Sequence, residues 1–170
     1  MDPTKYERGH PLIGGLVAGL IGGAVLAAML AGMSAARGGD VWVAMKGAAA
    51  PFLGERAQVP GFDAGAVALG LVCHFGIAIV WSVLFAAISY GLSRGATVVA
   101  GALWGVVVWF GMYYLVLPVV GLPQIARSTP LSDAILTHVV FGLAVGLGFL
   151  PFQHERPTAP PVRRAPMGAG

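Results

Sequence analysis

The chain has 170 residues, of which 57% are hydrophobic and 10% are charged, and its net charge is +3. Soluble domains carry about 25% charged residues, so the composition excludes an ordinary soluble protein. No Asp, Glu, Lys or Arg occurs in residues 11–36, 64–93, 95–126 or 134–153. Each run reaches the roughly 20 residues that a helix needs to cross a hydrocarbon core about 30 Å thick. Because the runs are continuously apolar and do not alternate, we predict an all-α integral membrane four-helix bundle in a lipid bilayer.

The transmembrane domain is expected to cover residues 11–152, between a short N-terminus (1–10) and a Pro-rich, basic tail (153–170). Ser132 or Asp133 is expected to cap the last helix, since both residue types favour that position. The four transmembrane helices are predicted at about 11–36, 64–92, 97–117 and 132–150.

The first long connection contains a further, shorter helical element. The stretch "DVWVAMKGAAAPFLG", residues 40–54, begins with Asp40, a good helix-capping residue, and carries Trp42 and Lys46. An aromatic side chain close to a lysine is typical of a helix that lies in the membrane interface. We therefore predict a short interfacial helix in this first outer loop.

The distribution of basic residues favours one orientation in the membrane. Six Lys or Arg residues lie in the N-terminus, the connection around Arg94 and the tail, whereas four lie in the two loops on the opposite side. Because basic residues are enriched in cytoplasmic loops, both termini are expected in the cytoplasm. The positive charge suits an anionic membrane surface and gives no support to nucleic-acid binding.

The two halves of the chain show a weak internal repeat. "APFLG" (50–54) follows the first predicted helix and "LPVVG" (117–121) follows the third. Each is followed by a loop, an aspartate and a helix with one histidine. Two helix pairs of like orientation would be related by an axis along the membrane normal. The alternative is chance similarity between helices that are rich in Ala, Gly and Val.

Small residues recur at every fourth position of the first helix, from Gly15 to Ala35. Such spacing lets a neighbouring backbone approach closely, which is how membrane helices pack. Whether the neighbour is a helix of the same chain or of another subunit is left open by the pattern. The residues expected at helix contacts are Gly15, Gly19, Gly23, Ala27, Ala31, Gly70, Gly101, Gly105, Gly142 and Gly146.

His74 and His138 are the two histidines within apolar helices, and both lie on small-residue faces. Ionisable groups in membranes point into the bundle, so each is expected to face another helix. The favoured interpretation is one interhelical hydrogen bond per imidazole, worth about 1 kcal/mol, with no cofactor. The alternative is that the two rings face each other and bind both axial positions of a haem b.

The sequence shows few other signs of catalytic or metal-binding chemistry. No acidic residue lies inside a predicted span, and the sequence has no nucleophile elbow, phosphate loop or metal-ligand spacing. Its single cysteine, Cys73, excludes an intramolecular disulfide. We therefore expect no enzyme and no metal site.

The stretches "HFGIAIVW" (74–81) and "THVVFGLAVG" (137–146), with the loop segment at 40–54, resemble small uncharacterised bacterial membrane proteins, the YagU-like inner-membrane proteins. The resemblance covers about residues 11–150. It implies a four-helix protein of the bacterial inner membrane and brings no catalytic residues with it.

Three functions remain at this stage. The leading hypothesis is a non-catalytic accessory subunit that packs against other membrane-protein subunits or against further copies of itself. The first alternative is a redox protein that holds haem b between His74 and His138. The second is a small transporter or channel, which the internal repeat suggests.

Overall fold

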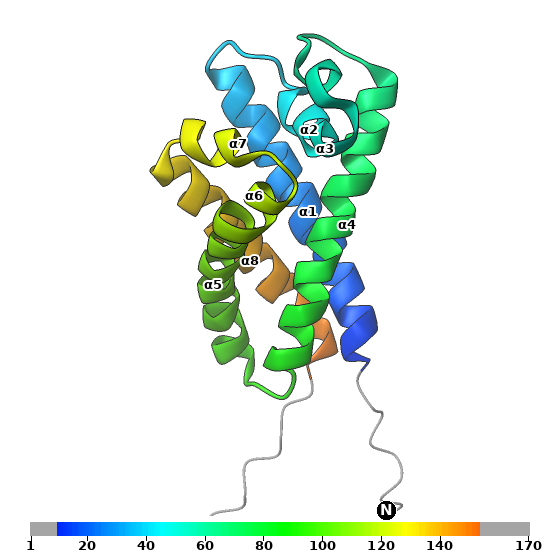
Figure 1. Ribbon diagram of the computed structural model, residues 1–170. Helices are drawn as coiled ribbons and strands as arrows, with labels where there is room; N and C mark the ends of the chain where they lie inside the picture. The colour runs from blue at the N-terminus through cyan, green and yellow to red at the C-terminus, as the bar shows by residue number, and fades with distance from the viewer. Residues whose placement is uncertain (1–9, 154–170) are drawn as a thin grey trace, which may run out of the picture.

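A computed structural model describes residues 10–153 of the chain (Figure 1). Over this range the protein is helical and contains no strand, and four helices are long and apolar enough to cross a membrane. They are α1 (Pro11–Ala36), α4 (Ala64–Ser89), Arg94–Val119, which begins with α5 (Arg94–Gly111), and α8 (Leu131–Phe149). This confirms the predicted membrane four-helix fold. The predicted terminal segments lie almost entirely outside the described residues.

Two helix starts differ from the predicted ones. α5 begins at Arg94, before the predicted 97, because the Ser93 hydroxyl accepts a hydrogen bond from the Ala96 amide and so caps the helix. α8 begins at Leu131 after Pro130, so the predicted cap at Ser132 or Asp133 is wrong. Proline fixes its own φ near the value found here, −55°, and lets the helix start immediately after it.

The third span is not α-helical to its end. After α5, residues Met112–Val116 form a π-helical turn, η2, and Leu117–Val119 form the short helix α6. Pro118 has no N–H for the Tyr114 carbonyl and its ring would clash with that carbonyl. The helix therefore widens over the turn before the proline. Such single π turns occur frequently at functional sites.

α1 and α8 form the centre of the bundle. α1 packs against both α4 and α8, and α5 packs chiefly against α8. α4 and α5 meet through large aromatic side chains: the Trp104 indole N–H donates to the Trp81 carbonyl oxygen at 3.1 Å, and Phe85 lies against the Trp104 ring. Close backbone packing on one side and bulky rings on the other thus close the four helices into a bundle.

The glycines mark where backbones approach most closely. A Cβ at Gly15 or Gly19 would lie 2.7 Å from the Cα of Val83 or Ile79 on α4, too close for a real side chain. A Cβ at Gly101 would lie 2.5 Å from the Gly142 carbonyl oxygen on α8. Each half of the chain therefore contains one tightly packed pair, α1 with α4 and α5 with α8. The internal repeat itself stays a prediction.

The long connection after α1 folds over the end of the bundle, which we call the loop end (residues 37–63 and 120–130; Figure 1). This first connection contains the short elements α2 (Val43–Ala48), α3 (Ala50–Leu53) and η1 (Gly54–Gln58). The second connection, before α8, contains the short helix α7 (Pro123–Ser128). Residues 40–54 thus contain two short helices instead of the one that was predicted. Gly70 of α4 lies against the Met45 carbonyl, so α2 packs directly on α4.

Lys46 holds this connection together from inside and is only 1% exposed. Its ammonium donates to the Asp40 carboxylate at 2.8 Å and to the carbonyl oxygens of Val59 and Gly61. The hydrogen bond from Lys46 lowers the pKa of Asp40. Lys46 is therefore a structural anchor of this connection, and its ammonium is bonded inside the protein.

Asp63 fixes the start of α4. One carboxylate oxygen accepts from the Ala66 amide at 3.1 Å, and the guanidinium of Arg56 donates to both oxygens, at 2.8 and 3.0 Å. The hydrogen bond from Arg56, helped by the Ala66 amide, lowers the pKa of Asp63 to about 2.

Candidate functional site

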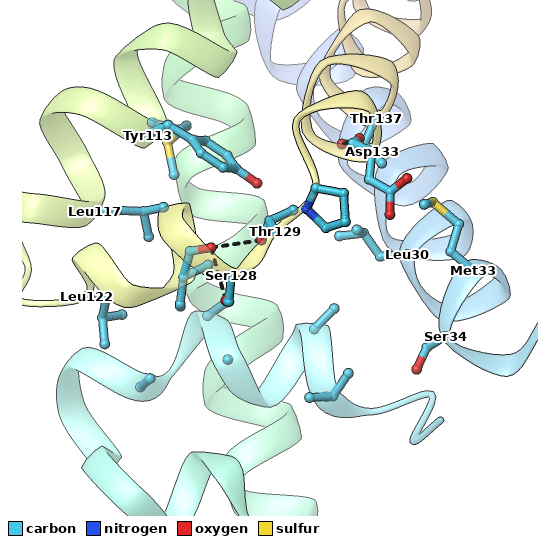
Figure 2. A pocket seen from close by; sticks show the side chains of 18 of the residues that line it. Leu30, Met33, Ser34, Tyr113, Leu117, Leu122, Ser128, Thr129, Asp133 and Thr137 are labelled. Atoms are coloured by element: carbon cyan, nitrogen blue, oxygen red, sulfur yellow. Dashed lines mark hydrogen bonds between the residues drawn. The ribbon is translucent and has the colours of Figure 1, made fainter. Parts of the chain in front are cut away.

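A cavity of about 780 Å³ lies at the loop end, between the two halves of the chain (Figure 2). The end of α1, the short helix α2, the π turn η2, the α7 connection and the start of α8 all contribute to it. Most of its surface is apolar. Its larger apolar side chains are Leu26, Leu30, Met33, Val43, Met112, Leu117, Leu122 and Ile125.

The side of the cavity formed by α2 is built from small residues. Ala44, Gly47 and Ala48 line it, and a Cβ added at Gly47 would meet nothing within 4 Å. This wall explains much of the volume, because short side chains leave the space between α2 and the apolar wall unfilled.

A polar cluster lies where η2 meets α8. The ring of Tyr113 packs edge-on against the His138 imidazole, with 5.7 Å between the ring centroids. The Tyr113 hydroxyl is directed toward Thr129 (Figure 2). The π turn places Tyr113 here, so Pro118 shapes the cavity from the next turn of the same helix.

One ion pair also lines the cavity. The Arg37 guanidinium at the end of α1 lies 2.7 Å from the Asp133 carboxylate at the start of α8. Arg37 is 61% exposed and Asp133 18% exposed. The pair joins the two central helices and leaves these two opposite charges balanced.

The two predicted site histidines have different surroundings. His138 lines the cavity, and its Nδ1 lies 2.8 Å from the Ala134 carbonyl oxygen one turn earlier in α8. His74 is not among the lining residues; its Nε2 lies 2.8 Å from the Gly23 carbonyl oxygen of α1. His74 thus makes an interhelical bond, whereas His138 bonds within its own helix.

The predicted packing residues divide between several neighbours. Gly15, Gly19 and Gly23 of α1 face α4, and Ala27 and Ala31 further along are half-buried. Gly70 of α4 lies against α2 at the Met45 carbonyl. The other four predicted residues join α5 to α8 through backbone contacts, and they are Gly101, Gly105, Gly142 and Gly146. None of the predicted packing residues lines the cavity.

Sequence reasoning missed most of the cavity's polar residues. Arg37 was counted only among the basic loop residues, Asp133 was expected only as a helix cap, and Tyr113 was not singled out as a site residue. A signal for Tyr113 was present, since Pro118 lies within an otherwise apolar span and predicts an irregular turn before it.

Comparison with known proteins places the chain in a family. The model of a family of unknown function, DUF6789, matches residues 10–159, and the chain therefore belongs to this family. No curated protein and no solved structure matches it. Membership of an uncharacterised family is thus confirmed, and the likeness to YagU-like proteins stays a prediction.

Proposed function

We propose that this member of the DUF6789 family is a non-catalytic membrane protein that binds a small amphiphilic molecule in the loop-end cavity. The main observation in support is the size of the cavity. Its volume of about 780 Å³ falls within the roughly 300–1,000 Å³ that is usual for small-molecule binding sites. Such sites combine apolar walls with a few convergent polar groups. The cavity has this character, with Leu26 and Leu30 on its apolar wall and Tyr113 and His138 together on another side.

The position of the cavity favours an amphiphile over a water-soluble ligand. It is built from the ends of membrane-spanning helices and from short connecting helices, so its walls run from apolar spans to exposed polar loops. A molecule with an apolar chain and a small polar head matches both environments.

The proposal is tested by filling the cavity from its small-residue wall. Gly47→Phe places a ring where a Cβ meets nothing, so it should fold and occupy ligand space. Gly76→Phe is the matched control, because Gly76 is an exposed α4 glycine whose Cβ also meets nothing and which does not line the cavity. Native mass spectrometry of protein released from mild detergent should show a bound small-molecule adduct in the wild type and in Gly76→Phe. The adduct should be lost in Gly47→Phe, and an identical adduct pattern in all three proteins would refute the proposal.

The accessory-subunit hypothesis loses one of its supports. The α1 stripe that suggested a partner is occupied within the chain, since Gly15, Gly19 and Gly23 face α4. A partner would have to use other faces of the bundle. Blue-native gels of gently solubilised membranes test it, because migration only as a small monomer counts against it.

The haem hypothesis faces one structural cost. His74 uses its Nε2 for the bond to the Gly23 carbonyl, so ligation through that atom requires the bond to break. A Soret band in the purified protein that disappears in both His74→Ala and His138→Ala would favour haem over the amphiphile.

A further inference from the structure

The tautomer of His138 follows from its partner. Its Nδ1 lies 2.8 Å from the Ala134 carbonyl oxygen, and a carbonyl oxygen only accepts hydrogen bonds. Nδ1 must therefore carry a proton and donate. In the neutral ring, Nε2 then holds a lone pair and acts as an acceptor.

The Nε2 atom of His138 has no hydrogen-bond partner in the protein and is not fully buried. Within residues 10–153, the buried side-chain nitrogen and oxygen atoms without a hydrogen-bond partner are Ser82 Oγ, Ser89 Oγ and Trp109 Nε1. His138 Nε2 has no protein donor and is not among them, so it reaches accessible space. His138 lines the cavity, and we infer that the open space beside Nε2 is the cavity.

The hydroxyl groups around the cavity already donate their protons elsewhere. Thr137 donates to the Asp133 carbonyl oxygen at 2.7 Å, Thr129 to that of Ile125 at 2.8 Å, and Ser34 to that of Asp40 at 2.8 Å. The Thr129 proton is therefore used within its own segment, and the Tyr113 hydroxyl oxygen can accept a hydrogen bond from a ligand. The serine and threonine hydroxyls therefore have no proton left to donate to a ligand, whereas His138 Nε2 and the Tyr113 oxygen can each accept a hydrogen bond from one.

Charge selects against an ionised head group. The two charged residues that line the cavity, Arg37 and Asp133, neutralise each other at 2.7 Å. The donors left over, on Arg37, Gln58 and Gln124, belong to exposed side chains that water already solvates. A buried anionic or cationic head would lose its hydration without gaining a partner of opposite charge.

We propose that the ligand carries a neutral hydroxyl head group, and that this hydroxyl donates its hydrogen bond to Nε2 of His138. This inference rests on the proposed function, since it specifies which amphiphile the cavity takes. An alcohol and a phenol both fit this description, because both are neutral hydrogen-bond donors at pH 7. The apolar chain of the ligand would lie along the wall formed by Leu26 and Leu30.

The test compares matched probes on the full chain in lipid nanodiscs. 1-Hexadecanol and 4-nonylphenol supply the two sources of a hydroxyl, the methyl ether of each removes only the donor, and palmitate supplies an anionic head. One lost hydrogen bond of about 1 kcal/mol corresponds to roughly a fivefold weaker Kd. We expect at least one hydroxyl probe to bind about fivefold more tightly than its ether, and that preference to vanish in His138→Phe.

The outcomes separate the two levels of the proposal. Tighter binding of 1-hexadecanol or of 4-nonylphenol than of its ether supports the inference and identifies the source. Equal binding of alcohol and ether to the wild type, with loss of both in Gly47→Phe, overturns the hydroxyl inference and keeps the cavity as a site. Tightest binding of palmitate overturns it too. Binding of every probe unchanged by Gly47→Phe overturns the proposed function itself. The wild-type comparison needs no variant, so misfolding of His138→Phe does not obscure the result.

Discussion

Replacing Gly101 by alanine tests whether backbone contact between α5 and α8 holds the bundle together. The added Cβ would lie 2.5 Å from the Gly142 carbonyl oxygen and 3.0 Å from the Gly146 Cα. Both neighbours are backbone atoms of a packed helix, so no flexible side chain can move aside. Gly76→Ala is the control, because its Cβ meets nothing within 4 Å.

The magnitude follows from the displacement that the new Cβ imposes. Ordinary van der Waals contact begins at 3.4 Å, so the two helices must separate by about 0.9 Å around Gly101. A gap of about 0.5–1 Å removes a quarter to a half of the attraction of each atom pair. Overpacking of this kind costs roughly 1–3 kcal/mol, and a rigid backbone neighbour favours the upper half of that range. We expect Gly101→Ala to lower the free energy of unfolding by about 2–3 kcal/mol.

The assay is unfolding of purified protein in mixed micelles by titration with SDS. Tryptophan fluorescence follows the transition, since Trp81 and Trp104 lie in contact between α4 and α5. Gly76→Ala should unfold at the same SDS fraction as the wild type or later. If Gly101→Ala also stays within about 0.5 kcal/mol of the wild type, the size expected of a neutral surface change, the close packing of α5 on α8 is wrong.

Three further predictions use the same titration or a thermal melt. Lys46→Met removes the buried ammonium and leaves the Asp40 carboxylate and two carbonyl oxygens without their donor. The free energy of unfolding should therefore fall by about 2–3 kcal/mol. An unchanged free energy of unfolding would show that Lys46 does not anchor the loop. The folded-state pKa of Asp63, about 2, lies below its ordinary 3.8. Its ionised form therefore stabilises the fold above about pH 4, and the melting temperature should fall as pH drops from about 4 to about 2. Asp63→Asn should remove that component of the pH dependence, and an unchanged profile would contradict the Arg56 pairing. Gln153→Ala removes side-chain hydrogen bonds to Ser89, Gly91 and Thr97, so the free energy of unfolding should fall by about 1–3 kcal/mol. A loss below about 0.5 kcal/mol would contradict a stabilising role of these three bonds.

The membrane-spanning helices were predictable because the bilayer requires long runs of apolar residues, and such runs are visible in the sequence. Charge-free runs of sufficient length allow only a membrane helix, and α1 covers 11–36 as predicted. The irregular end of the third span was not predicted, because hydropathy does not register the lost N–H of Pro118. Glycine spacing predicted close packing, but it carries no information on which helix is the neighbour.

The cavity was predictable only in part. His138 was recognised because an imidazole in an apolar helix is conspicuous. Arg37 and Asp133 meet through the packing of α1 against α8, and no local pattern encodes a contact between such distant segments. The buried state of Lys46 was missed for the same reason, since three of its partners come from the fold of the loop.

The place of the cavity follows from where the small residues of α5 stop. Gly101 and Gly105 bring α5 into backbone contact with α8, and Gly105 lies against the carbonyl of His138. The next positions at the same spacing are Trp109 and Tyr113, and at the second of these a tyrosine ring, instead of a small residue, meets the His138 ring of α8. η2 then widens the helix at the level of Tyr113. The residues at this four-residue spacing on α5 thus account both for the tight packing near the α4–α5 turn and for the open space at the loop end. The His138 ring lies at the boundary between the two regions.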